Sequence, residues 1–364
     1  MHVEVQIYIT IQLKHEVMYI IQAFACNIST KKCINAGNKK HAHFRNALSL
    51  HIFQSTMAMA REMNFLKLSK ILADHDRCIE WCKENNLLAL SLKCPRAGCH
   101  NALSWTRRAS SRDGYEWRCS KRGCNGAASM RQKSWFSGSR LSIEKVLALT
   151  YAWAHKFTTT QAVHETSLDD ETTSTETVID WYNYCREVCA DRIMNHHAGP
   201  IGGPGTTIEI DESKFGKMKY HRGRKIEGKW VFGGLCRETK ACFLVPVERR
   251  DKETFLPIIR AQILPGTRVM SDLWRSYDCL KDEGYEHLTV NHSLNFVDPD
   301  TGAHTQGIEN TWWGVKRSYP RTGTSKELFE SYLQEFMWRK HYGENPFGNI
   351  LKHIAELYNV GNDI

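Results

Sequence analysis

The chain has 364 residues, more than one typical domain, so two or three structural units are expected. Its formal net charge is +9, from 49 Lys and Arg against 40 Asp and Glu, which suits a polyanionic partner such as DNA. No run reaches the roughly 18 apolar residues of a membrane span and no convincing signal peptide is present, so the 13 cysteines are expected to be buried or metal-bound in a reducing, intracellular compartment.

Residues 1–62 show no clear hydrophobic period. They are expected to form an N-terminal extension, either disordered or an artefact of the gene model, with Met63 as the natural start in the second case. From Met63 the pattern becomes regular: residues 64–72 have helical spacing and residues 74–85 continue it. Cys78 and Cys82 fall on one face of that helix, where packing is preferred over metal binding.

Two matched cysteine pairs lie in the expected unit 63–140. Cys94 and Cys99 have four residues between them, as do Cys119 and Cys124, and each stretch contains a glycine. Zinc favours four thiolates in a tetrahedron, so the pairs predict a zinc-ribbon-like module with one structural Zn²⁺. Reduced cysteines in an ordinary hairpin are the alternative.

Basic and aromatic residues interleave between and around the cysteine pairs, as they do on many nucleic-acid-binding surfaces. Residues 107–140 carry nine Lys and Arg against Asp113 and Glu116, so they are expected to contact phosphate; a solvated basic face is the alternative. The residues singled out are the aromatic Trp105, Tyr115 and Trp117, and the basic Arg107, Arg108, Arg118, Lys121 and Arg122.

Residues 141–197 are expected to form a helical unit. Residues 142–155 have helical spacing, residues 158–165 suggest a short second helix, and the sequence Thr173 to Glu176 has the pattern of a capping box that begins a third. Three helices with short joints resemble a DNA-binding helix-turn-helix unit. Because this region is acidic, a helical linker bundle is the alternative.

A linker rich in glycine and proline, residues 198–205, is expected to resist both helix and sheet. Beyond it the expected order is three strands (206–211, 229–236, 241–248), a helix (251–263), a strand (267–271), a helix (276–283), a strand (287–291) and a helix from Gly307. This order predicts an α/β catalytic domain, a mixed sheet with flanking helices, over residues 206–358.

Three acidic residues stand at informative places in that pattern. Asp211 and Asp272 end hydrophobic strands, so both carboxylates are expected at one edge of the sheet, and Glu309 begins an amphipathic helix that can lie over them. Carboxylate oxygens are the ligands that Mg²⁺ and Mn²⁺ favour, and such a trio can hold two cations about 3.5–4 Å apart. Glu212 should face the opposite side of its strand and is a weaker candidate.

The surroundings of the three acids complete the candidate site. His292 and His304 are candidates for positioning DNA or assisting proton transfer, and Trp312 and Trp313 are both expected to be core residues. A second basic stretch, residues 213–225, has six Lys and Arg and no acid. The expected phosphate contacts here are Lys214, Lys217, Lys219, Arg222, Arg224, Lys225, Lys316 and Arg317.

Four segments of the sequence resemble the Merlin superfamily of eukaryotic DNA transposons, which is similar to bacterial insertion-sequence transposases with a zinc-ribbon front end. The segments are the strand ending Ile210-Asp211-Glu212, the block Lys229 to Gly234, the pair Ser271-Asp272, and His304 to Trp313, with 36 residues between Asp272 and Glu309. The resemblance spans about residues 63–358. It implies a ribonuclease-H-like fold, a DDE catalytic triad of Asp211, Asp272 and Glu309, and a nuclear location.

The expected function is that of a DDE transposase. It would bind the terminal inverted repeats of a mobile element, cut double-stranded DNA with two Mg²⁺ or Mn²⁺ ions, and join the freed end to target DNA. Cutting two ends together implies at least a homodimer. The alternatives are a domesticated DNA-binding protein that no longer cuts, and a structure-selective nuclease on the same fold.

Overall fold

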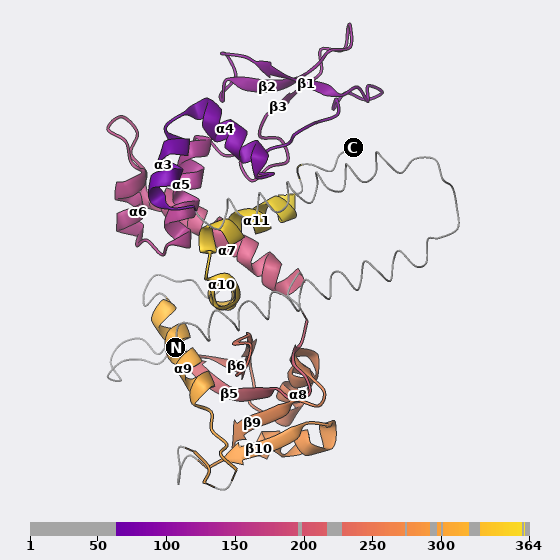
Figure 1. Ribbon diagram of the computed structural model, residues 1–364, viewed down its shortest axis with the longest axis vertical. Helices are drawn as coiled ribbons and strands as arrows, with labels where there is room; N and C mark the ends of the chain where they lie inside the picture. The colour runs from indigo at the N-terminus through magenta and orange to yellow at the C-terminus, as the bar shows by residue number, and fades with distance from the viewer. Residues whose placement is uncertain are drawn as a thin grey trace, which may run out of the picture. The chain divides into compact units, whose positions relative to one another are not determined.

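The computed structural model describes residues 63–195, 199–216, 228–273, 275–291, 297–299, 301–319, 328–358 and 360. The chain divides into two compact units, Met1–Met57 and Ala58–Ile364, and every described residue belongs to the second. Figure 1 shows the helices and strands of that unit. The predictions for residues 1–62 lie outside the described residues.

Two short helices precede the cysteine module. Helix α3 spans Phe65–Leu72 and helix α4 spans His75–Glu84. Each begins at a side-chain cap, because Asn64 accepts the amide of Lys67 and Asp74 accepts the amide of Arg77. The second cap separates what the sequence suggested was one continuous helical pattern. Cys78 and Cys82 are fully buried, which confirms packing as their role.

The cysteine module contains a three-stranded antiparallel sheet in the order β1-β2-β3. Its strands are Leu103–Arg107, Tyr115–Cys119 and Ala127–Ser129. Asp113, in the turn between the first two strands, forms a buried ion pair with Arg131. The module thereby continues directly into the helical unit, since Arg131 also donates to the carbonyl oxygen of Leu141.

Three helices form the next part of the chain, as predicted: α5 Ile143–Ala154, α6 Thr159–Thr166 and α7 Thr175–Asn195. The predicted capping box at Thr173 to Glu176 is wrong by one residue. The cap is Ser174, which accepts the amide of Thr177. The reciprocal box occurs instead at α6, between Thr158 and Gln161.

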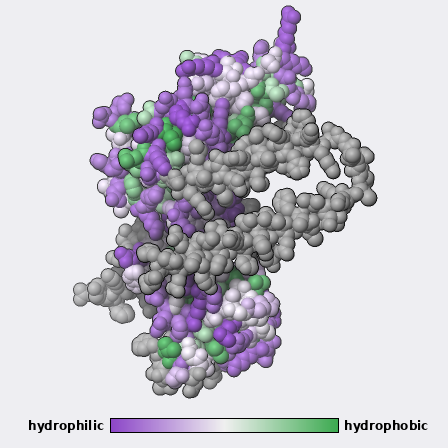
Figure 2. Space-filling view, viewed as in Figure 1, coloured by the Kyte–Doolittle hydropathy of each residue, from purple (hydrophilic) through white to green (hydrophobic). Residues whose placement is uncertain are grey.

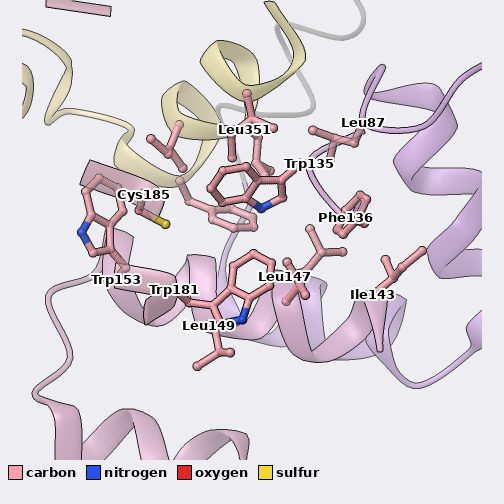
Figure 3. Close-up of a cluster of buried hydrophobic side chains, with 14 of the residues drawn as sticks. Leu87, Trp135, Phe136, Ile143, Leu147, Leu149, Trp153, Trp181, Cys185 and Leu351 are labelled. Carbon is pink, nitrogen blue, oxygen red and sulfur yellow. The ribbon is translucent and has the colours of Figure 1, made fainter. Parts of the chain in front are cut away.

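The core of these helices includes the last helix of the described residues. Helix α10 spans Phe329–Tyr342 and helix α11 spans Pro346–Tyr358. Trp338 and Leu351 belong to the same buried cluster as Trp153, and Figure 3 shows Leu351 among the aromatic side chains of this core. Although residues 206–358 were expected to form one catalytic domain, α11 therefore packs with the helical unit.

The second core is built on a five-stranded mixed sheet in the order β10-β9-β5-β6-β7. Figure 1 labels β10, β9, β5 and β6 of this sheet. Strand β5 pairs antiparallel with β6 and parallel with β9, β7 extends the antiparallel side, and β10 extends the parallel side. The strands are β5 Thr207–Phe215, β6 Lys229–Cys236, β7 Cys242–Val247, β9 Arg268–Asp272 and β10 Glu286–Val290.

Helices cover both faces of this sheet. Helix α8, Lys252–Gln262, packs on one face, and helix α9, Gln306–Ser318, packs on the other with α10. The predicted mixed α/β arrangement with flanking helices is confirmed. One element differs in type, because the helix expected at residues 276–283 is the 3-10 helix η2, Arg275–Glu283.

The linker at residues 198–205 was expected to resist sheet formation, but it contains a short strand. Strand β4, Ile201–Gly202, pairs in parallel with β8, Ile263–Leu264. Gly202 has a φ of +97°, and a Cβ there would lie 2.5 Å from the Thr267 hydroxyl oxygen. Glycine thus lets the linker approach the sheet closely instead of leaving it free.

Candidate active site

The candidate site is organised by the alternation of side chains along β5. Ile208 and Ile210 belong to the core beneath α8, so the residues between them face α9. Three contacts join that face to α9. Glu209 accepts the amide of Ile308, Asp211 accepts the indole N–H of Trp312, and the Lys316 ammonium donates to the Ser213 hydroxyl.

The spacing of these contacts explains why α9 runs along β5. Two residues of strand rise about 6.8 Å and four residues of helix about 6 Å. Consecutive inward positions on the strand therefore match consecutive turns of the helix. Gly233 lies beside Asp211 in the sheet, and a Cβ there would come within 2.7 Å of the Trp312 ring. The glycine thus leaves the space through which the indole reaches Asp211.

Asp211 and Asp272 lie on neighbouring parallel strands, just beyond the last paired residues of β5 and β9. Asp272 is the last residue of β9, whereas Asp211 is in the middle of β5, so the prediction that its strand ends at residue 211 is wrong. The register pairs Ile208 with Val269 and Glu209 with Met270, so continuing it by two residues places Asp211 beside Asp272. Val269 packs in the same core as Ile208, which puts Asp272 on the same face as Asp211. The two side chains therefore lie on one face of the sheet, where β9 ends and β5 continues.

The environment of Asp211 disfavours a negative charge. Burial is the main reason that the pKa of Asp211 is raised to about 7, and the charges of Glu212 and Asp272 add to it. The hydrogen bond from Trp312 acts in the opposite direction. A divalent cation would relieve this accumulation of charge, so the donor set fits the Mg²⁺ or Mn²⁺ ions that the sequence predicts.

Glu309 lies in the first turn of α9, where its exposed carboxylate accepts a hydrogen bond from the Thr305 hydroxyl at 3.3 Å. It is one helical turn from Trp312, the residue that contacts Asp211. Within the described ranges, the four cysteines of the module are the only group of three or more His, Cys, Asp or Glu residues whose potential metal-binding atoms all lie within 4.8 Å of one another. Asp211, Asp272 and Glu309 therefore do not form so tight a cluster.

Glu212 faces away from α9, as the alternation predicts. Its carboxylate accepts hydrogen bonds from the Tyr277 hydroxyl at 2.7 Å and from Arg250 at 3.2 Å. Burial raises the pKa of Glu212, the charge of Asp272 adds to this, and the two donors oppose it. These contacts tie Glu212 to the opposite core.

The two tryptophans of α9 have different environments. Trp312 is buried at 4% exposure, as predicted. Trp313 is 65% exposed with the Arg317 guanidinium 5.1 Å from its ring, so its assignment to the core is wrong. Adjacent helical positions are about 100° apart, which is why only one of the two can face the sheet.

Sequence reasoning missed Glu209. It lies two residues before Asp211 and is 1% exposed, and its carboxylate contacts Arg237 and the start of α9. The signal was available, because positions two apart on a strand share a face. Of the two candidate histidines, His304 lies 3.8 Å from Glu209, whereas His292 is outside the described residues.

The aromatic residues of the cysteine module are not an open stacking surface. Trp117 is buried, and Trp105 is covered by the Lys83 ammonium, 3.1 Å from its ring centroid. The Tyr115 hydroxyl donates to Asp76. The aromatic and basic residues alternate along the sequence, but they do not form one exposed surface, because the aromatic rings face α4.

Some of the basic residues predicted to contact DNA are exposed, and others contact acidic or aromatic side chains of the protein. Lys121 and Arg122 are exposed in the second cysteine turn, and Arg107 is exposed near Asp76. Arg108 and Arg118 both bond to Glu116, and Lys214 lies 5.5 Å from the Trp230 ring. Polar side chains dominate the described part of the face in Figure 2. The remaining candidates, Lys217, Lys219, Arg222, Arg224 and Lys225, lie outside the described residues.

Cys94, Cys99, Cys119 and Cys124 converge as predicted. The sulfur of Cys124 lies 3.5 Å from that of Cys94 and 3.4 Å from that of Cys99, and the sulfurs of Cys99 and Cys119 are 3.7 Å apart. Four sulfurs bound to zinc at about 2.3 Å in a tetrahedron would be about 3.8 Å apart. The cluster therefore fits a structural Zn²⁺.

The two cysteine turns have the same backbone hydrogen bonds, which explains their unusual spacing. The amide of the second cysteine binds the carbonyl oxygen two residues after the first, as in Cys99 to Arg96 and Cys124 to Lys121. The residue before each second cysteine is a glycine with positive φ, +73° at Gly98 and +78° at Gly123. The spacing of four is thus a repeated turn that glycine permits.

None of the helices within the described ranges combines the length and apolar character that crossing a membrane requires.

Comparison with known proteins identifies the family. Residues 198–341, which include Asp211, Asp272 and Glu309, match the model of an ISXO2-like transposase domain. An uncharacterized transposase-like protein from Haemophilus influenzae is 37% identical over 103 residues, which is 28% of this chain and 82% of that protein.

Two solved structures show weaker similarity, each with 13% sequence identity. The magnesium complex of the HTLV-2 integrase catalytic core has a TM-score of 0.23, over 37% of this chain and 84% of that one. A simian T-cell lymphotropic virus intasome bound to a PP2A regulatory subunit has a TM-score of 0.26, over 53% and 67%. Membership therefore rests on the sequence matches, and by these the chain belongs to the ISXO2-like transposase family.

Proposed function

We propose that the protein is a DDE transposase that binds the ends of a mobile DNA element, cleaves DNA strands and transfers the freed ends to target DNA. The observation that carries this proposal is the pair of carboxylates, Asp211 and Asp272, on one face of two neighbouring parallel strands within a transposase-family segment, close enough for the charge of Asp272 to raise the pKa of Asp211. The ribonuclease-H-like character of the catalytic domain is part of the same proposal. Its support is the mixed sheet with helices on both faces.

Asp211, Asp272 and Glu309 are the proposed ligands of two Mg²⁺ or Mn²⁺ ions. Bound ions of this kind activate a water or 3′-hydroxyl and stabilise the leaving oxygen of the phosphodiester. The chain's own residues prepare the ligands. Trp312 holds one oxygen of Asp211, and Thr305 donates to the carboxylate of Glu309. These contacts orient the carboxylates before a cation binds.

DNA binding is assigned to the basic residues that the sequence singled out. Lys121 and Arg122 project from the second cysteine turn, and Arg317 lies beside the exposed Trp313 at the far end of α9. Phosphate contacts of this kind fix the position of a duplex without reading its sequence. A homodimer or larger assembly follows from the need to cut two ends together.

The finer assignments rest on the sequence resemblance alone. They are membership of the Merlin superfamily, a eukaryotic host and a nuclear location. The helical unit α5–α7 is proposed to assist in binding element ends, as a helix-turn-helix unit would.

A cleavage assay tests the proposed function. Wild-type protein should nick supercoiled plasmid DNA, and cut labelled duplexes made from the DNA that flanks its gene, only when Mg²⁺ or Mn²⁺ is added. Asp211→Asn and Glu309→Gln should abolish cleavage and retain DNA binding in a gel-shift assay. Glu283→Gln, which alters a carboxylate paired with Arg260 elsewhere, should cleave normally. Undiminished cleavage by Asp211→Asn, or none by wild type, contradicts the proposal.

A further inference from the structure

Glu209 is a buried carboxylate that the proposed catalytic trio does not include. It is 1% exposed, and its two oxygens have separate partners. One accepts from Arg237 Nε at 2.6 Å, and the other accepts from the backbone amide of Ile308 at 2.8 Å. A buried charge is costly unless it is paired in this way, so its presence requires an explanation.

The amide that Glu209 binds belongs to the first turn of α9. The first amides of a helix have no partner within the helix and are usually bound by a capping side chain. Thr305, at the N-cap position of α9, makes no capping hydrogen bond to a helix amide. Glu209 therefore performs the capping role from a neighbouring strand, and its negative charge suits the positive end of the helix.

Arg237 fixes the chain just before the helix. While its Nε atom binds Glu209, its Nη2 atom donates to the carbonyl oxygen of His304 at 2.7 Å. The segment from His304 to Ile308 is thus held at both ends. Thr305, which lies inside this segment and is buried, donates to the carboxylate of Glu309.

Gly307 is fitted to the same contact. A Cβ at this position would lie 2.8 Å from the Glu209 oxygen and 3.0 Å from Leu235 Cδ2. Only a glycine lets the first turn of α9 approach the Glu209 carboxylate at the observed distance. Gly307, Glu209 and Arg237 therefore act together on one backbone segment.

We propose that Glu209, supported by Arg237, is a positioning residue that clamps the first turn of α9 to β5 and so sets the place of the Glu309 carboxylate. This inference rests on the proposed role of Glu309 as a metal ligand. Glu209 itself touches neither substrate nor metal. Loosening the clamp should weaken cation binding while the chemistry at saturating cation is retained.

Two variants disturb the clamp from opposite sides. Glu209→Gln keeps the shape but replaces one acceptor oxygen with an amide nitrogen, and Gly307→Ala adds a methyl group on the helix side. The matched control is Glu238→Gln, because Glu238 also accepts a backbone amide of β5, that of Thr207 at 3.0 Å, away from α9. All three variants can be compared with wild type by thermal unfolding to establish that they are folded.

The first readout is amide hydrogen exchange in the part of α9 that begins at Ile308. Exchange there should accelerate about tenfold or more in both clamp variants and remain unchanged in Glu238→Gln. The second readout is calorimetric titration with Mn²⁺ alone, in which both clamp variants should bind about tenfold more weakly than wild type. Raising the Mn²⁺ concentration should then restore cleavage in both variants.

The outcomes separate this inference from the proposed function. Unchanged α9 exchange in Glu209→Gln and Gly307→Ala overturns the clamp, whatever the activity. Faster exchange with wild-type Mn²⁺ affinity overturns the link from the clamp to Glu309. If wild-type protein neither binds Mn²⁺ nor cleaves DNA, the proposed function fails, and the positioning role of Glu209 fails with it. If Glu209→Gln does not fold, Gly307→Ala alone decides between these outcomes.

Discussion

Asp211 is a proposed metal ligand whose pKa is strongly changed by its surroundings in the structure. Burial and two neighbouring carboxylates raise its pKa to about 7, so at neutral pH the folded protein holds this proton only in part. A group with these properties is costly to the fold when ionised. Strongly perturbed carboxyl groups of this kind are characteristic of functional sites.

The raised pKa predicts how stability depends on pH. From about pH 4 to pH 7 the folded protein retains a proton that the unfolded chain has lost, so the contribution of Asp211 to stability falls as the pH rises through this window. Asp211→Asn removes the effect. Without added divalent cations, its melting temperature should match that of wild type near pH 4 and exceed it above pH 7.

Asp251→Asn is the control for this measurement. Asp251 caps α8 by accepting the Thr254 hydroxyl and amide, and the pKa of Asp251 is lowered mainly by the hydroxyl. Its variant should therefore lose stability relative to wild type at neutral pH and recover as the pH falls below about 4. A constant difference between Asp211→Asn and wild type from pH 4 to pH 8 would refute the assigned environment of Asp211.

Single residues could be predicted where the signal is local. The four cysteines follow from their spacing, and the structure brings their sulfurs together. Asp272 follows from the end of its strand, whereas β5 continues beyond Asp211 to Phe215. Trp105 and Trp313 could not be placed, because which side of a ring faces solvent depends on partners distant in sequence. Glu209 was overlooked although its position two residues before Asp211 carried the information.

At the scale of elements, the alternation of strands and helices from Thr207 to Ser318 agrees closely with the sequence pattern. Hydrophobic periodicity determines such elements locally, so their order is readable. The pairing of β4 with β8 could not be predicted from the sequence, because a strand of two residues has no hydrophobic period and is defined only by its hydrogen bonds to the partner strand. The displaced cap at Ser174 shows that capping patterns leave an uncertainty of one residue.

The fit between α9 and the sheet gives a prediction at this scale. Gly233→Ala would place a methyl group 2.7 Å from the Trp312 ring and 3.0 Å from Leu244, so we expect a loss of about 1–3 kcal/mol in the free energy of unfolding. Gly314→Ala, on α9 itself, meets Phe336 at 3.4 Å. It should be neutral or stabilise by about 0.5–1 kcal/mol, since alanine favours helix. Urea unfolding measures both, and equal effects would contradict the proposed packing.

The cysteine module gives a second prediction at this scale, which concerns bound zinc. Purified protein should contain one zinc ion per chain by atomic absorption, and Cys94→Ser should release it. Cys279→Ser is the matched control, because Cys279 bonds to the Ser276 carbonyl oxygen outside the cluster and should leave the zinc content at one. Metal content well below one in wild type would favour the alternative of reduced cysteines in a hairpin.

For the whole molecule, α10 links the two cores. Leu333 of this helix packs with α9 on the sheet, whereas Trp338 is fully buried in the core of the helical unit, where its indole N–H donates to His353. Arg339 donates to the carbonyl oxygens of Trp153 and Ala154. The sequence could not reveal this connection, because residues 153 and 339 are paired only by the tertiary fold.

Trp338→Ala tests that connection. Removing a fully buried tryptophan should cost about 3–5 kcal/mol, and hydrogen exchange should show the loss of protection in α5 and α7, which precede the linker. Trp313→Ala, at a position that is 65% exposed, should change stability by less than about 0.5 kcal/mol. A loss of protection confined to the sheet would contradict a shared core.

The central claim is that Asp211, Asp272 and Glu309 hold divalent cations on the face of the sheet that α9 covers. The most direct test is a crystal of the protein grown with Mn²⁺ and measured for anomalous diffraction. We predict anomalous peaks bound by oxygens of Asp211 and Asp272, with Glu309 as a further ligand. Anomalous peaks elsewhere, with none at these carboxylates under saturating Mn²⁺, would contradict it.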